Sequence, residues 1–329
     1  MNPEPSSAPD DDEQQERRWS ERIGAHARLW LALGVLATGL GFLGGLHWAV
    51  GLAAHFRVQY VLAALMIGIV AALVRDTRAV VVAAALVCVN VAPVIGATFI
   101  GVGPDPDHAR ALSVMSINVY RDNPDAAAVQ AAIREARPDV VGLIEVNARW
   151  GGALLEPLKD LYPHQKVATD ESMFGLALLS RTPLRDAELI APGGGGFPVI
   201  RARVEGQGGR EVTILLVHPP PPIMPSLARA HEAQLDALPE VVRGAGERVV
   251  LMGDLNATPW SHPFQALLSG SGLRDSRVGV GIHTTWPAAA PIAGLPLDHV
   301  LVKGLEVVAR RIGPDVGSDH LPVLVELGW

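Results

Sequence analysis

Polar side chains suited to acid–base and metal chemistry follow several short apolar runs in this 329-residue chain. Each run has the length and composition of a buried strand. Buried strands that end in carboxylates, amides and imidazoles can bring these groups together at one edge of a sheet, where they could hold a divalent cation and a phosphate group. The residues are Asn118, Glu145, His218, Asp254 and Asn256, after runs that begin at positions 113, 140, 212 and 249.

Two further polar clusters accompany the last apolar runs of the chain. Asp298 lies at the head of one run, and Asp319 and His320 lie just before the next. An imidazole has a pKa in the range for proton transfer, and a neighbouring carboxylate can fix its tautomer. Hydrolysis of a phosphate ester needs a cation at the nonbridging oxygens, a base for the attacking water and donors for the developing charge. The clusters complete a set of groups suited to that reaction.

The N-terminal third is strongly apolar, and it dominates the positive mean hydropathy of +0.26. Three segments carry no formal charge: 29–54, 58–74 and 79–104. Each is near the roughly 20 residues that cross a bilayer, so we expect three transmembrane helices, the middle one being the shortest. A signal peptide has a single apolar region, which does not fit three successive runs. Buried helices of a soluble core are the other alternative, but charge-free runs of this length favour lipid.

Basic residues near the span ends predict the orientation of these helices. The excess of arginine lies on the N-terminus and on the second loop, so both should be cytoplasmic. Three crossings then place everything after Pro104 outside the cytoplasm. The arginines are Arg17, Arg18, Arg22 and Arg28 before the first span, Arg57 in the first loop, and Arg75 and Arg78 at the second loop.

Strands and helices alternate after residue 110. The sequence Asn123-Pro124-Asp125 supplies a helix N-terminus, and a helix is predicted over 126–136. A second helix is predicted over 226–238, and strands are predicted over 174–180 and 199–204. Strands with intervening helices imply a layered α/β domain in which helices cover a sheet.

As a set, the polar clusters resemble the endonuclease/exonuclease/phosphatase superfamily, and the N-terminal spans resemble those of its membrane-anchored bacterial members. The resemblance covers roughly residues 111–329, with the main motifs in family order. It implies an α/β fold, a four-layer αββα sandwich preceded by the three transmembrane helices, and metal-dependent hydrolysis of phosphate esters. The motifs are Asn118, Glu145, Gly253-Asp254-Leu255-Asn256-Ala257-Thr258-Pro259, Leu297-Asp298-His299-Val300-Leu301-Val302 and Ser318-Asp319-His320-Leu321-Pro322-Val323.

We therefore expect a disordered cytoplasmic tail (1–28), a membrane region (29–104), a linker (105–110) and a catalytic domain (111–329). In a bacterium this predicts a multi-pass protein of the inner membrane with a periplasmic or extracellular catalytic domain. From Asp105 on, 20 Lys and Arg face 26 Asp and Glu, a net charge of −6 that weakens a nucleic-acid-binding hypothesis.

The resemblance implies a site for Mg²⁺ or Mn²⁺ made of oxygen ligands. Glu145 would be the main ligand with Asn118 beside it, and Asp319 would approach the metal directly or through water. Mg²⁺ retains several waters, so one carboxylate and an amide oxygen can suffice. Taken alone, Glu145 could equally cap a strand end or form a salt bridge.

The resemblance also implies catalytic roles for His218, Asp254, Asn256, Asp298 and His320. Asp298 would be the carboxylate partner of His320, which would act as general base or as an imidazolium that stabilises the phosphate. Asp254 would orient or deprotonate the attacking water, and Asn256 would donate to the phosphate. His218 occupies the place of a phosphate-contacting residue, although a lone histidine at a strand end is more often structural.

Neighbouring residues receive structural interpretations. We expect His299 to be a packed neighbour and Trp286 to belong to the core. Arg201 and Arg229 are expected on the surface rather than at a phosphate. The prolines at 219–222 should form an extended rim without backbone donors that shapes access to the site.

The leading hypothesis is a membrane-anchored, metal-dependent phosphoesterase that hydrolyses phosphate mono- or diesters outside the cytoplasm. Its substrate could be a phospholipid head group, a small phosphodiester or a nucleic acid, and no protein partner is implied. One alternative is an extracytoplasmic nuclease, which would need a local basic strip such as Arg201, Arg203 and Arg229. The other is a non-catalytic membrane-anchored binding module, which the completeness of the polar set disfavours.

Overall fold

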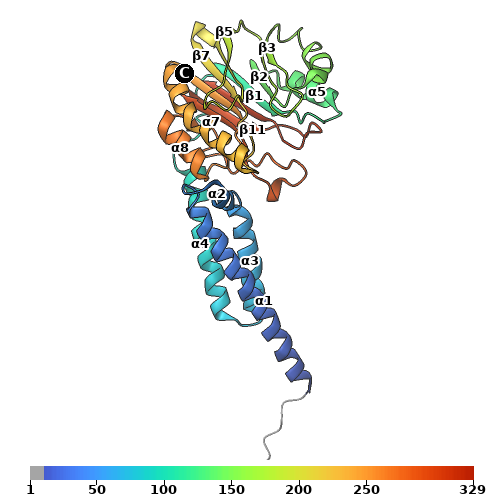
Figure 1. Cartoon of the computed structure of the whole chain (residues 1–329), viewed down its shortest axis with the longest axis vertical. Coiled ribbons are helices and arrows are strands. Elements are labelled where there is room, and N and C mark those ends of the chain that lie inside the picture. Colours follow the sequence, from blue (N-terminus) through green and yellow to red (C-terminus); the bar gives the residue numbers. More distant parts are fainter. Residues whose placement is uncertain (1–10) are drawn as a thin grey trace, which may run out of the picture.

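The computed structural model describes residues 11–329, with side chains from Gln14 onward, and has a helical and an α/β part (Figure 1). The helical part consists of α1 (Asp11–Phe42), α2 (Trp48–His55), α3 (Arg57–Leu73) and α4 (Thr77–Phe99). The long helices α1, α3 and α4 lie side by side as a bundle, and α2 lies where the bundle meets the α/β part (Figure 1). The α3–α4 turn is at the far end of the bundle.

Within the described part of the chain, two helical segments are long and apolar enough to cross a membrane, Gln14–Phe42 within α1 and Thr77–Phe99, which is α4. A third span is obtained only if α2 and α3, bent by 58° at their junction, are taken as one. The predicted first segment, 29–54, is therefore wrong as one continuous helix. A glycine-containing turn ends α1, and His47 starts α2 by accepting a hydrogen bond from the Ala49 N–H (3.2 Å). Hydropathy does not predict such a break, because glycine and a cap residue end or start a helix through backbone conformation and hydrogen bonds.

Residues 11–28 form the start of α1, so the predicted disordered tail is wrong for this segment. Glu, Gln and Arg in it favour helix, and Arg17 pairs with Glu21 one turn later (3.1 Å). The apolar helix that follows supplies a nucleus, which these residues extend at little cost. The rest of the predicted tail, residues 1–10, lies outside the described residues.

Two six-stranded sheets form the centre of the α/β part, in the orders β11-β12-β1-β2-β4-β3 and β5-β6-β7-β8-β10-β9. The first sheet contains β1 (Leu112–Asn118), β2 (Val140–Ile144), β3 (His164–Ala168), β4 (Leu176–Ser180), β11 (Glu306–Ile312) and β12 (Val323–Gly328). The second contains β5 (Arg185–Ile190), β6 (Val199–Glu205), β7 (Glu211–Val217), β8 (Val249–Asp254), β9 (Arg274–Asp275) and β10 (Asp298–Lys303).

Helices cover the outer face of each sheet, which gives four layers. The first sheet packs on α5 (Ala126–Ala136) and on α6 (Ala148–Trp150) with the π-helical turn Gly151–Leu155, and the second packs on α7 (Pro225–Gly244) and α8 (His262–Ser271). A third apolar core fills the space between the sheets, where Val114 and Ile144 of one sheet meet Leu216 and Met252 of the other. The predicted αββα sandwich is confirmed.

The two predicted helices are present, and one of them is longer than predicted. α5 has the predicted bounds, and its N-cap is Asp125, which accepts a hydrogen bond from the Ala128 N–H (2.9 Å). α7 continues to Gly244 and includes Pro239, near which the predicted helix ended. Leu238 and Val242 are both buried against the second sheet, so tertiary packing continues the helix past the proline.

Candidate active site

Strand register brings four polar groups to one edge of the first sheet. β1 and β2 run parallel, and Asn118 lies opposite Ile144, which directly precedes Glu145. β12 runs antiparallel to β1, so the segment before it, with Asp319 and His320, returns to the end of β1. The Ser318 hydroxyl donates to the Asn118 carbonyl (2.7 Å) and fixes this segment. Parallel strands and one antiparallel return explain why residues far apart in sequence meet here.

The second sheet brings its own polar groups to the facing edge. β10 runs antiparallel to β8, and Asp298 lies opposite Asp254. β7 runs parallel to β8, so His218 emerges at the same end. Gly253 precedes Asp254 with φ +149°, and a Cβ there would collide with the backbone carbonyl of β7. A glycine is therefore needed for Asp254 to reach this position.

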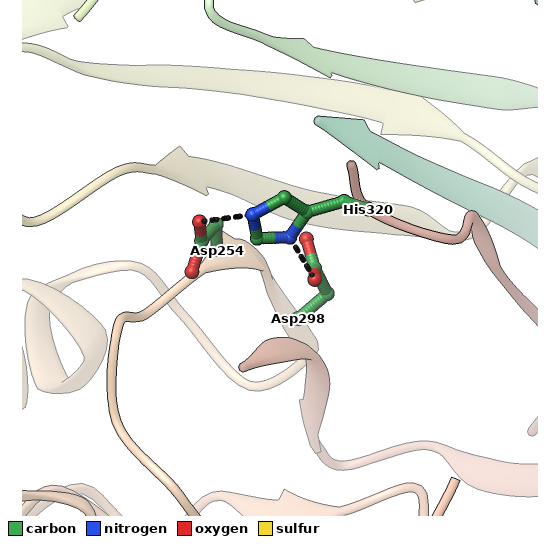
Figure 2. A group of neighbouring side chains, drawn as sticks. All are labelled: Asp254, Asp298 and His320. Carbon is green, nitrogen blue, oxygen red and sulfur yellow. Dashed lines mark hydrogen bonds and ion pairs between the residues drawn. The ribbon is translucent and has the colours of Figure 1, made fainter. Parts of the chain in front are cut away.

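His320 lies between two carboxylates (Figure 2). Its Nδ1 is 2.7 Å from Asp298 Oδ2, and its Nε2 is 3.6 Å from Asp254 Oδ2. All three side chains are buried. The Asp298 N–H donates to Thr285 Oγ1 (3.1 Å), and the His320 N–H donates to the Ser318 hydroxyl (3.1 Å). Backbone hydrogen bonds thus hold the acid and the imidazole in register.

The electrostatics of this cluster favour a charged imidazole. Burial disfavours charge on His320, but the Asp298 and Asp254 carboxylates together raise its pKa to about 10. Burial also disfavours charge on Asp298, yet the nearby His320 charge and hydrogen bond hold the Asp298 pKa below its usual range. At neutral pH the pair is therefore imidazolium and carboxylate.

Asp254 is the carboxylate closest to titration at neutral pH. Burial raises its pKa to about 6, against the opposing effect of His320. Its Oδ1 accepts from the Asn256 N–H (2.9 Å), and its Oδ2 accepts from the Asn118 amide (3.3 Å). A carboxylate with such a pKa can both accept and release a proton under working conditions.

His218 lies beside Asp254 as a neutral ring. Burial lowers the pKa of His218. Its Nδ1 is 3.0 Å from the Met173 carbonyl, which can only accept, so Nδ1 carries the proton. Its Nε2 is 3.7 Å from Asp254 Oδ2, within reach of a ligand between them.

Glu145 is held by Asn118 and by backbone. The Asn118 amide nitrogen donates to Glu145 Oε1 (3.0 Å), and the Arg121 N–H donates to Oε2 (3.2 Å). Asn118 Oδ1 accepts from the Tyr120 N–H (3.0 Å), so ligation of a metal through this oxygen would compete with that bond. Burial raises the pKa of Glu145. Glu145 and Asn256 have φ of +66° and +49°, a conformation that costs non-glycine residues on the order of 1–3 kcal/mol and clusters at functional sites.

The donor set fits a divalent cation. Among residues 14–329, no lysine or arginine forms an ion pair with the carboxylates of Glu145, Asp254, Asp298 or Asp319, and the ion pairs of Asp254 and Asp298 are with histidine. Each Glu145 oxygen accepts one hydrogen bond and retains a second lone pair. Asp254, Asp298 and His320 also offer atoms within 4.8 Å of one another, a spacing that could hold a metal ion. Ligation through His320 would need a neutral imidazole, whereas its two carboxylate neighbours favour the charged form, so Glu145 is the better ligand.

A cavity of about 590 Å³ opens in front of these groups. Asn118 and Asp298 do not line it and instead support the residues that do. Its apolar wall includes Leu52 and Phe56, from the α2–α3 junction, together with Ile223. The predicted site residues that line it are Glu145, His218, Asp254, Asn256, Asp319 and His320.

The structure corrects one interpretation and adds residues that the sequence did not indicate. Trp286, predicted to be in the core, is exposed at the cavity, and its Nε1 donates to Asp319 Oδ2 (3.1 Å). Its neighbour Thr285 is the buried member of this pair. Leu52 and Phe56 were missed because their apolar segment indicates only a membrane span.

Other residues near the site have structural positions. His299 is buried, its Nε2 lies 2.9 Å from the Ala257 carbonyl, and its ring packs on Phe264, as expected for a packed neighbour. Pro221 and Pro222 line the cavity, in the part of the chain predicted to form its rim.

The candidate basic strip is divided and neutralised. Arg201 pairs with Glu188, and Arg203 pairs with Asp186 and Glu211 on the outer face of the second sheet. Arg229 lies in α7 and lines a different cavity, beside the turn between α1 and α2. None of these arginines lines the cavity at Asp254.

Residues 115–320 match the sequence profile of the Endonuclease/Exonuclease/phosphatase family, and this range contains all eight site residues. The chain belongs to this family. Proteins of the family hydrolyse phosphate esters and include nucleases, phosphodiesterases and phosphatases. A stretch of 99 residues is 36% identical to a UPF0294 protein of Vibrio cholerae, covering 29% of this chain and 33% of that protein. The match therefore spans about a third of the length of these curated relatives.

Solved structures share the fold. One is the endonuclease/exonuclease/phosphatase from Beutenbergia cavernae, 22% identical with a TM-score of 0.54, which covers 67% of this chain and 72% of its own. Another is the 3′ phosphatase NExo from Neisseria bound to a product DNA hairpin, 24% identical with a TM-score of 0.55, which covers 67% of this chain and 100% of its own. At these identities the similarity establishes the fold alone.

Proposed function

We propose that this protein is a membrane-anchored, divalent-metal-dependent phosphoesterase that hydrolyses phosphate mono- or diesters outside the cytoplasm. The observation that carries the proposal is the buried His320–Asp298 hydrogen bond (2.7 Å) beside Asp254, at a cavity shared with Glu145. A charged imidazole, a carboxylate that titrates near neutral pH and a ligand for a cation are the groups that ester hydrolysis needs. A binding module would not require this combination.

Glu145 and Asp319 are the proposed ligands of Mg²⁺ or Mn²⁺. When bound, the cation neutralises a nonbridging oxygen and makes phosphorus more electrophilic. Asn118 positions Glu145 and Asp254 through the two hydrogen bonds from its amide nitrogen. Trp286 restrains Asp319 by its indole N–H.

Asp254 is the proposed base, because its pKa of about 6 leaves it ionised at neutral pH. It would take the proton of the attacking water, while the His320 imidazolium stabilises charge on the phosphate oxygens. Of the two roles expected for His320, its raised pKa favours this second one. Because neutral His218 carries its proton on Nδ1, its Nε2 would accept a hydrogen bond, either from the attacking water or from a protonated phosphate oxygen. Asn256 now donates to the Pro219 carbonyl (3.0 Å) and would turn to reach the phosphate.

An extracytoplasmic catalytic domain is part of the proposal. Arg28 pairs with Asp76 (2.5 Å) next to the α3–α4 turn, at the end of the bundle far from the α/β part (Figure 1). Arg75 and Arg78 flank the same turn, so the basic end of the bundle would face the cytoplasm. An alkaline phosphatase fused to the C-terminus should be active, and an inactive phosphatase with a fluorescent cytoplasmic reporter would contradict this orientation.

The catalytic proposal is tested with the full chain in detergent, supplied with Mg²⁺ or Mn²⁺. An artificial phosphodiester, phospholipid, plasmid DNA and RNA are offered in parallel, each with and without EDTA. Glu145→Gln and EDTA should each abolish turnover. Glu240→Gln is the matched control, because Glu240 is 81% exposed in the last turns of α7, which begins at the site edge and ends away from it. Turnover that survives both EDTA and Glu145→Gln would contradict the proposal.

A further inference from the structure

The membrane region supplies part of the wall of the catalytic cavity. Leu52, His55 and Phe56, at the junction of α2 and α3, line the same cavity as Glu145 and Asp254. This junction lies where the bundle meets the α/β part (Figure 1). The cavity is therefore enclosed by the catalytic groups on one part of its wall and by the end of the helical bundle on another.

Hydrogen bonds hold this junction to the loop that follows Asp254. The Thr258 N–H donates to His55 Nδ1 (3.3 Å), and the Trp260 indole N–H donates to the His55 carbonyl (3.4 Å). Both donors lie in the loop that follows Asp254, and His55 is itself buried. The side chain and the backbone carbonyl of His55 are thus both hydrogen bonded to this loop. These bonds hold the α2–α3 junction in a fixed position beside the site.

A second contact joins the start of α3 to a turn next to the cavity. Gln59, in the first turn of α3, donates to the Ala293 carbonyl (2.7 Å) and to the Gly294 carbonyl (3.2 Å). These carbonyls belong to the turn Pro291–Ala293 and its C-cap, between Trp286 and the start of β10. Leu295, next to this turn, lines the cavity as well. The first turn of α3 is thus held beside the segment that lines the cavity with Trp286 and Leu295.

Large apolar side chains are exposed on the segments that line the cavity or lie next to it. Phe56 is 43% exposed, Ile223 is 68% exposed, and Ile292 in the Pro291–Ala293 turn is 86% exposed. Phe56 and Ile223 also line the cavity, so this exposed apolar surface is continuous with the cavity wall. A small phosphodiester in water needs no such surface, whereas an acyl chain entering from a bilayer does.

We propose that the substrate is a phosphate ester of a membrane lipid, whose phosphate reaches Asp254 and His320 and whose apolar part lies on Leu52, Phe56 and Ile223. This inference rests on the proposed phosphoesterase activity and adds the class of substrate. The α2–α3 junction is then a substrate-specificity element as well as part of an anchor. A phosphate at the cavity floor and acyl chains at the end of the bundle match the two ends of such a molecule.

The test compares lipids with their own head groups. The full chain in detergent is given phosphatidylcholine vesicles that contain phosphatidic acid and phosphatidylglycerol. In parallel it is given their water-soluble counterparts, glycerol phosphate for the first lipid and glycerophosphoglycerol for the second. Wild type should hydrolyse at least one lipid with a higher kcat/KM than its soluble head group. Leu52→Ser and Phe56→Ser should each lower kcat/KM for that lipid about tenfold, with little change for the soluble ester.

Two controls separate substrate contact from fold. Phe56→Leu retains an apolar surface and should restore most lipid turnover. Leu46→Ser removes another exposed leucine, which lies in the α1–α2 turn and lines a different cavity, and it should leave both activities unchanged.

Each contrary outcome has a distinct meaning. Turnover of soluble esters without turnover of lipids overturns the lipid proposal and leaves the phosphoesterase intact. Equal losses of both activities in Phe56→Ser also overturn it, because the junction then only supports the fold of the site. Failure of wild type to hydrolyse any ester overturns the proposed function and this inference together.

Discussion

The helical bundle and the α/β part distribute apolar side chains in opposite ways. In the bundle, Trp30 and Leu73 are 61% and 78% exposed, while Asn90 and Thr38 are buried and hydrogen bonded to each other (2.9 Å). In the α/β part, the apolar residues of β1, β2 and β8 are almost completely buried, and most charged residues outside the candidate site and the Arg277 contact are exposed or half-buried. The same residue types thus face outward in one region and inward in the other.

This contrast supports the proposal that the bundle is a membrane anchor. The bundle core is small and made largely of alanine, including Ala64, Ala71 and Ala83, as is typical of helices that pack closely in lipid. Arg57, predicted to lie in a loop, is buried there, with its guanidinium over the Phe42 ring (4.1 Å) and 3.4 Å from Asn90 Oδ1. The α/β part instead gains its stability from three apolar cores around its sheets.

The largest effect is expected where the α/β part performs its chemistry. Asp254→Asn should lower kcat at least about 100-fold, because the amide cannot accept a proton from water. In wild type, activity should fall as pH drops below about 6, where Asp254 becomes protonated. A spectrophotometric assay with an artificial phosphodiester measures both. Asp236→Asn, in an exposed position of α7, should retain activity, and a similar loss in this variant would show that the assay reports general damage.

A smaller effect is expected for the residue that supports His320. Asp298→Asn should reduce kcat roughly 10- to 100-fold at neutral pH, since the His320 imidazolium, which stabilises the phosphate charge, loses the carboxylate that holds and favours it. The protonated ring is the proposed active form, so activity is kept below the His320 pKa and lost as pH rises through it. That pKa is about 10 in wild type and falls in the variant, which moves the alkaline loss to lower pH. An unchanged alkaline limb in the pH profile would exclude this role.

The contact between the two regions should contribute to stability more than to chemistry. Arg277 is buried, pairs with Asp275 (3.1 Å), and donates to Thr98 Oγ1 (3.1 Å) and the Ala97 carbonyl (3.0 Å) at the end of α4. Arg277→Ala should destabilise the protein by about 3–5 kcal/mol, because it leaves Asp275 buried and unpaired. Thermal unfolding in detergent measures the loss, with Arg243→Ala, an exposed ion-pair variant, as control.

The pH dependence of this stability has a defined sign. Burial opposes charge on Asp275, but Arg277 holds its pKa below the usual carboxyl value. The pair therefore stabilises wild type above that value, and the contribution is lost as pH falls through the lower folded-state pKa. The stability difference between wild type and Arg277→Ala should narrow in acid. A difference that widens in acid would refute the assignment.

The smallest effect is expected on the outer face of the second sheet. Arg203→Ala removes exposed ion pairs with Asp186 and Glu211, which contribute about 0–1 kcal/mol. Turnover of a small phosphodiester should stay within about twofold of wild type, as for most surface changes. A large loss of DNA cleavage in this variant, with a steep salt dependence of binding, would instead support the nuclease alternative.

The sequence by itself determined the candidate site residues and roughly where the strands end. Asn118 and Asp254 end buried apolar strands, and Glu145 and His218 directly follow such strands, because period and composition are local properties. The helix over 126–136 was predicted with its correct bounds for the same reason. The family followed from the order of the motifs.

Only the tertiary structure decided how the two regions meet. The exposed position of Trp286 and the placement of Leu52 and Phe56 at the cavity of the candidate site depend on contacts between segments distant in sequence. An apolar segment has the same hydropathy whether it crosses a bilayer or lines a site. The contacts of His55 with Thr258 and Trp260, some two hundred residues away, are what distinguish the two.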